Sequence, residues 1–289
     1  RGAVLYVHGF VDYFFQDHVA QAFADAGYAF FALDLRKYGR ALLPHQHPNF
    51  CADISEYYEE ISTSLTRISS LLSLPITLMG HSTGGLIAAL YCAEGKQCDL
   101  VHSLILNSPF LEFNEPAPMR ALLLPASNVI GKYWPYAILP KGLSPLYGES
   151  LHASVRGEWE YNLQWKPIHG FPVYWGWVRA IHRAHKRLQA GLGVKVPVLL
   201  LHSAASASPD KWQENSMRAD TVLNVADMKR YGPRIGNNVT LVEISGGMHD
   251  LFLSSEPVRT FALQTTLAWL EQVTDSQQDR MNEQTVPVA

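Results

Sequence analysis

The sequence Gly-His-Ser-Thr-Gly at residues 80–84 constrains the fold of this chain more than any other segment. It follows an apolar run at 76–79 and precedes a run of small and apolar residues at 85–91 that suits a helix. A strand, a tight turn and a helix in this order hold a serine side chain up at the end of a sheet. The turn strains the serine backbone, so the residues two positions away on each side must be small, as Gly80 and Gly84 are. The five-residue pattern also occurs by chance, and the flanking elements favour the interpretation of Ser82 as a nucleophile.

Short apolar runs alternate with helical patterns along the chain. Helices are expected at 19–26, 225–230 and 257–273, and the clearest spans 53–72, where apolar residues recur every three or four positions. There Asp53 and Glu56 form the expected N-cap and its capping-box partner. Strands alternating with helices predict a mostly parallel central sheet with helices on both faces. The six expected strands are 3–7, 28–33, 76–79, 103–106, 198–201 and 239–244.

One interval, 110–192, interrupts the alternation and is rich in proline, glycine and aromatic residues. An insertion of this length is more typical of a cap subdomain than of a loop. We therefore expect a core formed by 1–109 and 193–273, a cap at 110–192, and a polar, frayed tail at 274–289. Five of the seven tryptophans lie in the cap interval. The alternative is that about half of the cap aromatics form only a small core of their own. Four are predicted to contact substrate: Trp134, Trp159, Trp175 and Trp177.

Composition excludes several classes of protein. The chain has 289 residues, of which 47% are hydrophobic and 17% charged, so it can bury a large core. A net charge of −3 gives no reason to expect nucleic acid. No apolar run is long enough to span a membrane, and no signal-peptide pattern is visible. Three cysteines are too few for a disulfide framework and fit a reducing compartment, so we expect a cytoplasmic location. No ligand spacing typical of a metal site stands out, and we expect neither a metal nor an organic cofactor.

A serine nucleophile needs a base, and a histidine oriented by a carboxylate is a common one. His249 follows the last expected strand and precedes the last helix, at the sheet edge where sites of open α/β folds assemble. The acid should follow the strand at 198–201. Asp210 and Asp220 both lie in that connection, and Asp220 is favoured because it stands just before the helix-like run at 225–230. The alternative for each is a solvated loop carboxylate.

Acyl transfer also needs two backbone N–H donors for the oxyanion. The residue after the nucleophile, Thr83, is expected to supply one. The sequence His-Gly-Phe at 8–10 follows the first strand, and we assign the second donor to the amide of Phe10. Without the serine motif, the same three residues would be interpreted as an ordinary turn.

Five motifs occur in an order that resembles the α/β-hydrolase superfamily, and within it the monoacylglycerol lipase and lysophospholipase group of serine hydrolases. The resemblance covers nearly the whole chain apart from the cap and the tail, and it implies an α/β-hydrolase fold with an inserted cap. It also implies Asp220 as the acid, because an aspartate before an apolar pair and a helix matches the family's acid loop. The chain departs from the family in an insertion at 203–219 and in Lys37 and Tyr38, which stand where small residues are common. The motifs are His-Gly-Phe at 8–10, the segment 34–40, Gly-His-Ser-Thr-Gly at 80–84, the segment 219–223 and Gly-Met-His-Asp at 247–250.

The resemblance implies a carboxylic ester hydrolase, an esterase or lipase, in which Ser82, His249 and Asp220 cleave a lipid-like or small hydrophobic ester. Two alternatives stay open: a catalytically silent binding protein, and an aminopeptidase or amidase whose cap holds a substrate ammonium. The helix expected at 175–188 is basic and amphipathic, which indicates either peripheral membrane contact through the cap or a solvated helix face. The acidic groups available to an aminopeptidase are Glu112, Glu115, Glu149, Glu158 and Glu160.

Overall fold

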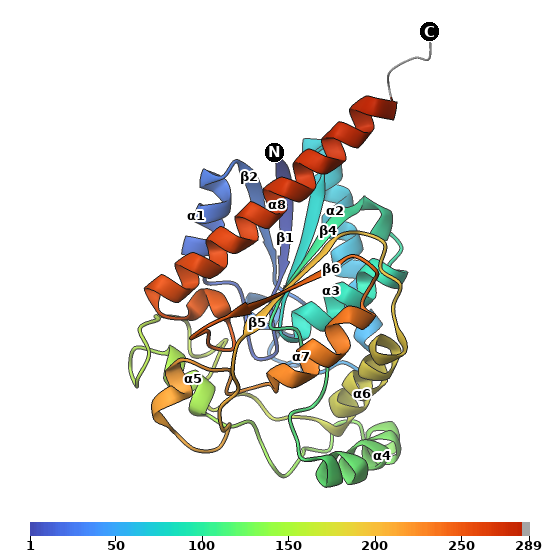
Figure 1. Cartoon of the computed structure of the whole chain (residues 1–289). Coiled ribbons are helices and arrows are strands. Elements are labelled where there is room, and N and C mark those ends of the chain that lie inside the picture. Colours follow the sequence, from blue (N-terminus) through green and yellow to red (C-terminus); the bar gives the residue numbers. More distant parts are fainter. Residues whose placement is uncertain (285–289) are drawn as a thin grey trace.

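The computed structural model describes residues 1–284, and side chains as far as residue 276. Six parallel strands form one sheet in the order β2-β1-β3-β4-β5-β6 (Figure 1). The order reverses beside β1, because β2 and β3 pair with its two sides. Ligands of open α/β sheets bind beyond the carboxyl ends of the strands at such a reversal. The strands are β1 (Gly2–Val7), β2 (Tyr28–Leu33), β3 (Ile76–His81), β4 (Val101–Asn107), β5 (Val198–Ser203) and β6 (Val239–Ile244).

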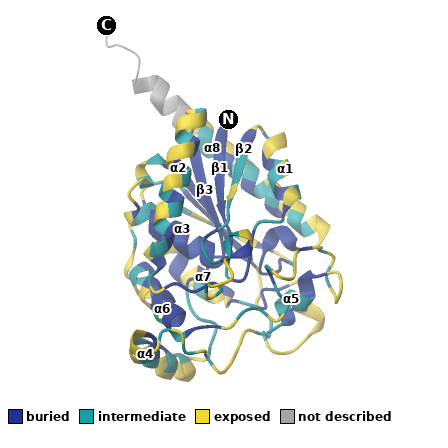
Figure 2. Ribbon diagram, turned by 180° about the vertical axis from the view of Figure 1, so that it is seen from behind, coloured by how far each residue is buried: buried dark blue, intermediate teal, exposed yellow. Residues whose placement is uncertain are grey.

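Helices cover both faces of the sheet, which confirms the predicted fold class. On one face, α1 (Asp17–Asp25) and α8 (Glu256–Gln284) pack against strand residues such as Val4 and Tyr6. On the other, the helices pack against Leu5 and its neighbours, and Figure 2 shows this side in front with the strands buried behind it. Successive β1 side chains therefore enter different cores, as the two-residue period of a strand requires. The second set of helices is α2 (Tyr58–Leu72), α3 (Thr83–Glu94), α6 (Trp175–Ala190) and α7 (Val225–Tyr231).

The helix expected at 53–72 begins as a 3₁₀ turn, Ile54–Tyr57, which leads into α2. The predicted capping box is present: Asp53 accepts a hydrogen bond from Ser55 N, and Glu56 accepts one from Asp53 N at 3.2 Å. The closing helix differs from the prediction, because residues 274–284 continue α8 where we expected a frayed tail. No glycine or proline interrupts the chain between 273 and 287, and its polar residues need no core to remain helical. The rest of the predicted tail, 285–289, lies outside the described residues.

The interval between β4 and β5 contains α4 (Ala117–Tyr133), α5 (Leu146–Leu151) and α6. Figure 1 shows α4 and α5 beyond the carboxyl ends of the strands, over the edge at which the serine motif lies. The last helix, α6, is part of the main core, since Val178, Ile181 and Leu188 are buried in the same cluster as α2 and α3. The insertion therefore leaves the sheet at β4 and returns to its surface through α6.

The first turn of α3 lies directly against the end of β1. A Cβ atom added to Gly84 would stand 2.3 Å from the carbonyl oxygens of both Val7 and His8, and one added to Gly80 would stand 2.5 Å from the Gly84 oxygen. The obstructing atoms are backbone, so they cannot rotate away as a side chain would. This contact explains why both glycines of the motif are needed.

We predict that Gly84→Ala lowers the free energy of unfolding by about 3 kcal/mol, because the added methyl group must push α3 away from the end of β1. Thermal unfolding followed by circular dichroism measures the change. Gly142→Ala is the matched control, since a Cβ there meets nothing within 4 Å. Equal melting temperatures for the two variants would contradict the close packing of α3 on β1.

Candidate active site

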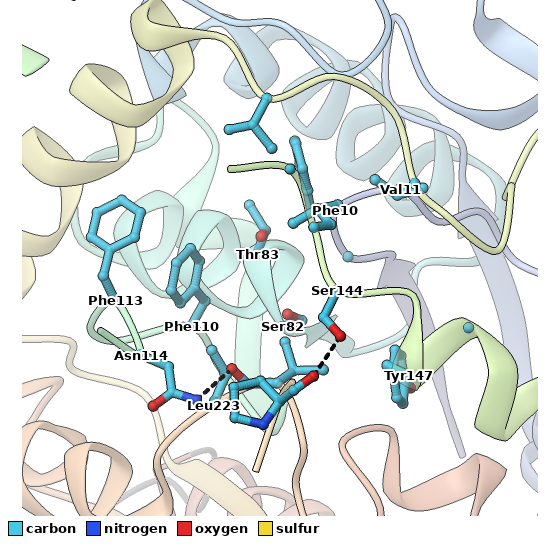
Figure 3. A pocket seen from close by; sticks show the side chains of 18 of the residues that line it. Phe10, Val11, Ser82, Thr83, Phe110, Phe113, Asn114, Ser144, Tyr147 and Leu223 are labelled. Atoms are coloured by element: carbon cyan, nitrogen blue, oxygen red, sulfur yellow. Dashed lines mark hydrogen bonds between the residues drawn. The ribbon is translucent and has the colours of Figure 1, made fainter. Parts of the chain in front are cut away.

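Ser82 occupies a strained turn between β3 and α3. Its φ of 52° and ψ of −118° are unusual for a residue with a side chain. The backbone around it is fixed by its neighbours: Ser82 N donates to the Asn107 oxygen, and the Ser82 oxygen accepts from Gly85 N and Phe110 N, each at 3.0 Å. These bonds fix the backbone and leave the hydroxyl in the cavity of Figure 3.

The structure brings Ser82, His249 and Asp220 into one hydrogen-bonded relay. His249 Nε2 lies 2.9 Å from Ser82 Oγ, and His249 Nδ1 lies 2.9 Å from Asp220 Oδ2. An ionised carboxylate only accepts hydrogen bonds, so Nδ1 carries the proton and Nε2 presents its lone pair to the serine hydroxyl. All three side chains are buried. The imidazole is thus oriented as a base toward Ser82.

The two aspartates considered for the acid position have different surroundings. Asp220 is fully buried, and its Oδ1 accepts hydrogen bonds from Val222 N at 2.8 Å and Leu223 N at 2.7 Å. These amides compensate for burial of the charge and fix the carboxylate plane. The Asp210 side chain is 60% exposed, and its nearest cation is Lys141, with Nζ 3.9 Å away. Asp220, not Asp210, reaches His249.

The backbone at the two expected oxyanion donors borders the serine. Thr83 is the first residue of α3, so its N–H has no acceptor within the helix. On the other side, a Cβ added to Gly9 would lie 3.1 Å from Ser82 Cβ, which shows how closely the loop after β1 approaches the serine. Phe10 and Thr83 both line the cavity, and both lie above Ser82 in Figure 3.

A cavity of about 550 Å³ opens over Ser82 and His249. Of the four tryptophans predicted to contact substrate, Trp175 and Trp177 line it, and the Trp177 ring packs against the Phe10 ring at a tilt of 30° with ring centroids 4.1 Å apart. The other two, Trp134 and Trp159, are not among the residues that line it. Trp134 is 63% exposed on the surface, and the Trp159 indole stacks on His18 and donates to the Leu253 oxygen. The sequence shows that these tryptophans lie in one segment, but it carries no information on where a loop side chain points.

A second buried carboxylate, Asp250, lies beside His249 and was not expected from the sequence. It accepts hydrogen bonds from Asn107 Nδ2 at 2.7 Å and Gln16 Nε2 at 3.1 Å. Burial alone would raise the pKa of Asp250, but nearby His81 and the hydrogen bond from Asn107 hold it below its ordinary value. This charge ties the His249 loop to β4 and to the start of α1.

Another group missed by sequence reasoning is the ion pair between Asp12 and Lys166. Both are buried, line the cavity and are separated by 154 positions in the chain. Tyr147 is close to both Lys166 and His249. No local pattern indicates such a pair, because periodicity and motifs report only neighbours in sequence.

Comparison with known proteins agrees with this architecture. Residues 1–256 match the model of the family described as Serine aminopeptidase, S33. A monoacylglycerol lipase from Mycolicibacterium smegmatis (strain ATCC 700084 / mc(2)155) is 30% identical over 137 residues, which are 47% of this chain and 46% of that protein. The chain thus spans about half the length of the curated relative that it matches.

Solved structures show the same fold. A soluble variant of monoglyceride lipase from Saccharomyces cerevisiae, in complex with a substrate analog, aligns with a TM-score of 0.72 and 18% identity, covering 94% of this chain and 87% of that one. The monoacylglycerol lipase of Paleococcus ferrophilus aligns with a TM-score of 0.71 and 21% identity, covering 94% and 95%. The resemblance drawn from the sequence motifs is confirmed, and the chain belongs to the serine aminopeptidase S33 family of α/β-hydrolases.

Proposed function

We propose that this chain is a carboxylic ester hydrolase that cleaves lipid-like or small hydrophobic esters through an acyl-enzyme. The observation that carries the proposal is the relay from Asp220 through His249 to Ser82, which ends at a cavity with mainly apolar lining residues. The similarity to monoacylglycerol lipases supports the choice of substrate class. Pockets of this size and character suit an acyl chain better than a highly polar substrate.

In the proposed reaction, Ser82 Oγ attacks the ester carbonyl carbon while its proton passes to His249 Nε2. Asp220 holds the Nδ1 proton in place and stabilises the imidazolium. Collapse of the tetrahedral intermediate breaks the bond to the alcohol oxygen, which takes the proton from His249. A water molecule then gives a proton to His249 and attacks the acyl-enzyme, which releases the carboxylic acid and restores the Ser82 hydroxyl. The amides of Phe10 and Thr83 bind the oxyanion in both steps.

The segment 110–192 is proposed to act as the cap that selects the substrate. It supplies the phenyl rings of Phe110 and Phe113 and other apolar lining residues. It is also bonded to the loop that carries the acid: Asn114 Nδ2 donates to the Val222 oxygen at 3.0 Å, and the Ser144 hydroxyl donates to the Pro209 oxygen (Figure 3). These bonds hold the segment across the cavity.

Amide hydrolysis by an aminopeptidase would use the same relay but would need an unpaired carboxylate for the substrate ammonium. Three of the five acidic residues expected to supply it are paired with cations. Glu115 lines the cavity but lies 3.3 Å from Lys141 Nζ, and Glu149 lies 2.7 Å from Arg156. Glu158 contacts Arg259. These ion pairs favour ester over aminopeptidase substrates.

The outer surface of α4 and the residues after it is proposed to contact a lipid membrane. Leu122, Tyr133 and Trp134 are each more than 60% exposed, and Lys132 lies over the Tyr133 ring. Exposed apolar and aromatic side chains beside a cation are typical of a helix that lies in the membrane interface. Met119, also on α4, is 48% exposed and lines the cavity, so this surface is continuous with the proposed site.

The sequence also suggested the basic helix α6 as a membrane contact, but α6 packs against the core of the protein. Its apolar face is buried in the core, and Arg183 Nη1 lies 3.5 Å from Asp53. Arg187 also contacts Glu94. These cations are paired within the chain, so α4 fits the membrane proposal better. None of the helices in the described part of the chain has the length and hydropathy needed to cross a bilayer.

We also propose a cytoplasmic location. The three cysteines are free thiols, and burial raises the pKa of Cys51 to about 12. A buried thiol of this kind is unreactive and is stable in a reducing compartment.

We predict that Ser82→Ala loses labelling by a fluorophosphonate probe and lowers ester hydrolysis by about 10⁴-fold or more, because the covalent step has no nucleophile. The measurement uses p-nitrophenyl esters from short to long acyl chains, together with aminoacyl anilides. A wild-type protein that neither labels nor cleaves any ester would refute the proposal. Cleavage of the anilides alone would establish the aminopeptidase alternative.

The acid is tested by a pair of isosteric substitutions. Asp220→Asn is expected to lower kcat by about 10⁴-fold, because the amide favours the wrong imidazole tautomer. Asp210→Asn, on the same loop but away from His249, should retain activity within a few-fold. A greater loss for Asp210→Asn than for Asp220→Asn would reverse the assignment.

The membrane surface is tested with Leu122→Ser/Trp134→Ser. We expect at least about tenfold weaker sedimentation with phosphatidylcholine–phosphatidylglycerol vesicles, because two side chains lose their burial in lipid. Hydrolysis of p-nitrophenyl acetate should not change. Phe261→Ser is the control, since Phe261 is 55% exposed on α8 and lies outside the α4 surface. Equal binding by the wild type and both variants would reject α4 as the contact.

A further inference from the structure

Asn107, the last residue of β4, is bonded to both the nucleophile turn and the loop of the base. It is fully buried, and its backbone oxygen accepts a hydrogen bond from Ser82 N at 3.0 Å. Its side chain is bonded to the two residues that follow His249: Nδ2 donates to Asp250 Oδ1 at 2.7 Å, and Oδ1 accepts from Leu251 N at 3.3 Å. One residue therefore contacts the nucleophile turn through its main chain and the loop of the base through its side chain.

Asp250 makes more hydrogen bonds than its local structural role requires. Its Oδ1 accepts from Phe252 N at 3.0 Å, which caps the 3₁₀ turn Leu251–Leu253. A neutral side-chain oxygen would suffice for such a cap. A carboxylate that is 1% exposed costs free energy to bury unless it has further partners. Asp250 has them on two other elements, Asn107 on β4 and Gln16 before α1, and bonds to an ionised acceptor are short and strong.

His249 is held in two ways, and each restricts a different movement. Asp220 binds the ring at Nδ1, so it fixes the tautomer and the rotation of the imidazole. The bonds from Asn107 hold the main chain directly after His249, from which the ring extends. The position of that main chain sets the distance from Nε2 to Ser82 Oγ, which is 2.9 Å. A displacement of about 1 Å between reacting groups can cost about 100-fold in rate.

We propose that Asn107 and Asp250 are positioning residues that hold His249 at hydrogen-bonding distance from Ser82. The proposal deepens the ester hydrolase function and rests on it. Neither Asn107 nor Asp250 lines the cavity, so an effect of either on the reaction passes through the catalytic relay. Loss of the bond between them is therefore expected to lower kcat and to leave KM unchanged.

The first test removes the side-chain bonds of Asn107 at similar volume. Asn107→Leu keeps the backbone oxygen that holds Ser82 N but has no donor for Asp250. With p-nitrophenyl butyrate, we expect kcat per folded molecule to fall about 10- to 100-fold, while KM changes less than about twofold. The folded fraction is measured by circular dichroism. A purely structural role would lower the folded fraction and leave kcat per folded molecule unchanged, which would reject the proposal.

The second test makes the same bond depend on pH. In Asn107→Asp, two carboxyl groups share one contact, so the pKa of one of them is raised. With that proton bound, the new carboxyl group donates to Asp250 and accepts from Leu251 N, as the amide does. As pH rises through the raised pKa, the proton is lost and the two charges repel. The ratio of variant to wild-type kcat, per folded molecule, should be near one at about pH 5 and fall at least about tenfold by about pH 9.

Taking this ratio at each pH cancels the titration of groups that both proteins share. The matched control is Asn49→Asp, which places a new carboxyl group at a buried residue that does not line the cavity, and its ratio should not change with pH. The titratable groups of neighbouring elements that interact with the Asp250 charge are His81, Lys166, Tyr6 and Tyr147.

A ratio for Asn107→Asp that does not change with pH would overturn the proposal, as would an equal fall in Asn49→Asp. Failure of the wild type to cleave any ester or to react with a fluorophosphonate would instead reject the hydrolase function itself.

Discussion

The contact between the start of α3 and the end of β1 is the constraint on which the site depends. With Gly84 against the backbone of Val7 and His8, the serine turn has no room to relax, and Ser82 keeps its φ of 52°. The same contact brings the loop at Gly9 against the serine side chain and the Thr83 amide to the cavity edge. Strain at one residue is stable here because the backbone around it is fixed from β1, β4 and α3 together.

Three buried carboxylates surround the site, and each is compensated in a different way. Asp220 is held by two backbone amides and His249, Asp250 by neutral amide side chains with His81 nearby, and Asp12 by the cation of Lys166. A buried charge without such partners would cost several kcal/mol. Rigid backbone donors suit an acid that must not move.

The sequence predicted the parts of this molecule that depend on local patterns. The six strands, the capping box at Asp53 and the positions of Ser82 and His249 at one sheet edge all follow from periodicity, turn chemistry and chain order. The direction of Trp134 and Trp159 could not be predicted, because a loop side chain has no periodic environment. The ion pair of Asp12 and Lys166 could not be predicted either, because only the fold brings two positions so distant in the sequence together. The end of α8 was missed because polar residues are equally compatible with a frayed tail and with a solvated helix.

The loop after β5 carries the acid and is hydrogen-bonded to two residues of the segment 110–192 that line the cavity. It accepts hydrogen bonds from Ser144 and Asn114, yet its Asp220 is fixed separately. Asp220 N donates to the Ala205 oxygen at 2.9 Å, its carbonyl accepts from Ala207 N at 2.8 Å, and its Oδ1 is bonded to amides of the next turn. If Asn114 and Ser144 moved away from this loop, their hydrogen bonds to it would break, but the bonds that hold Asp220 would remain. The position of Asp220, and with it the orientation of His249, therefore does not depend on the bonds between the proposed cap and this loop.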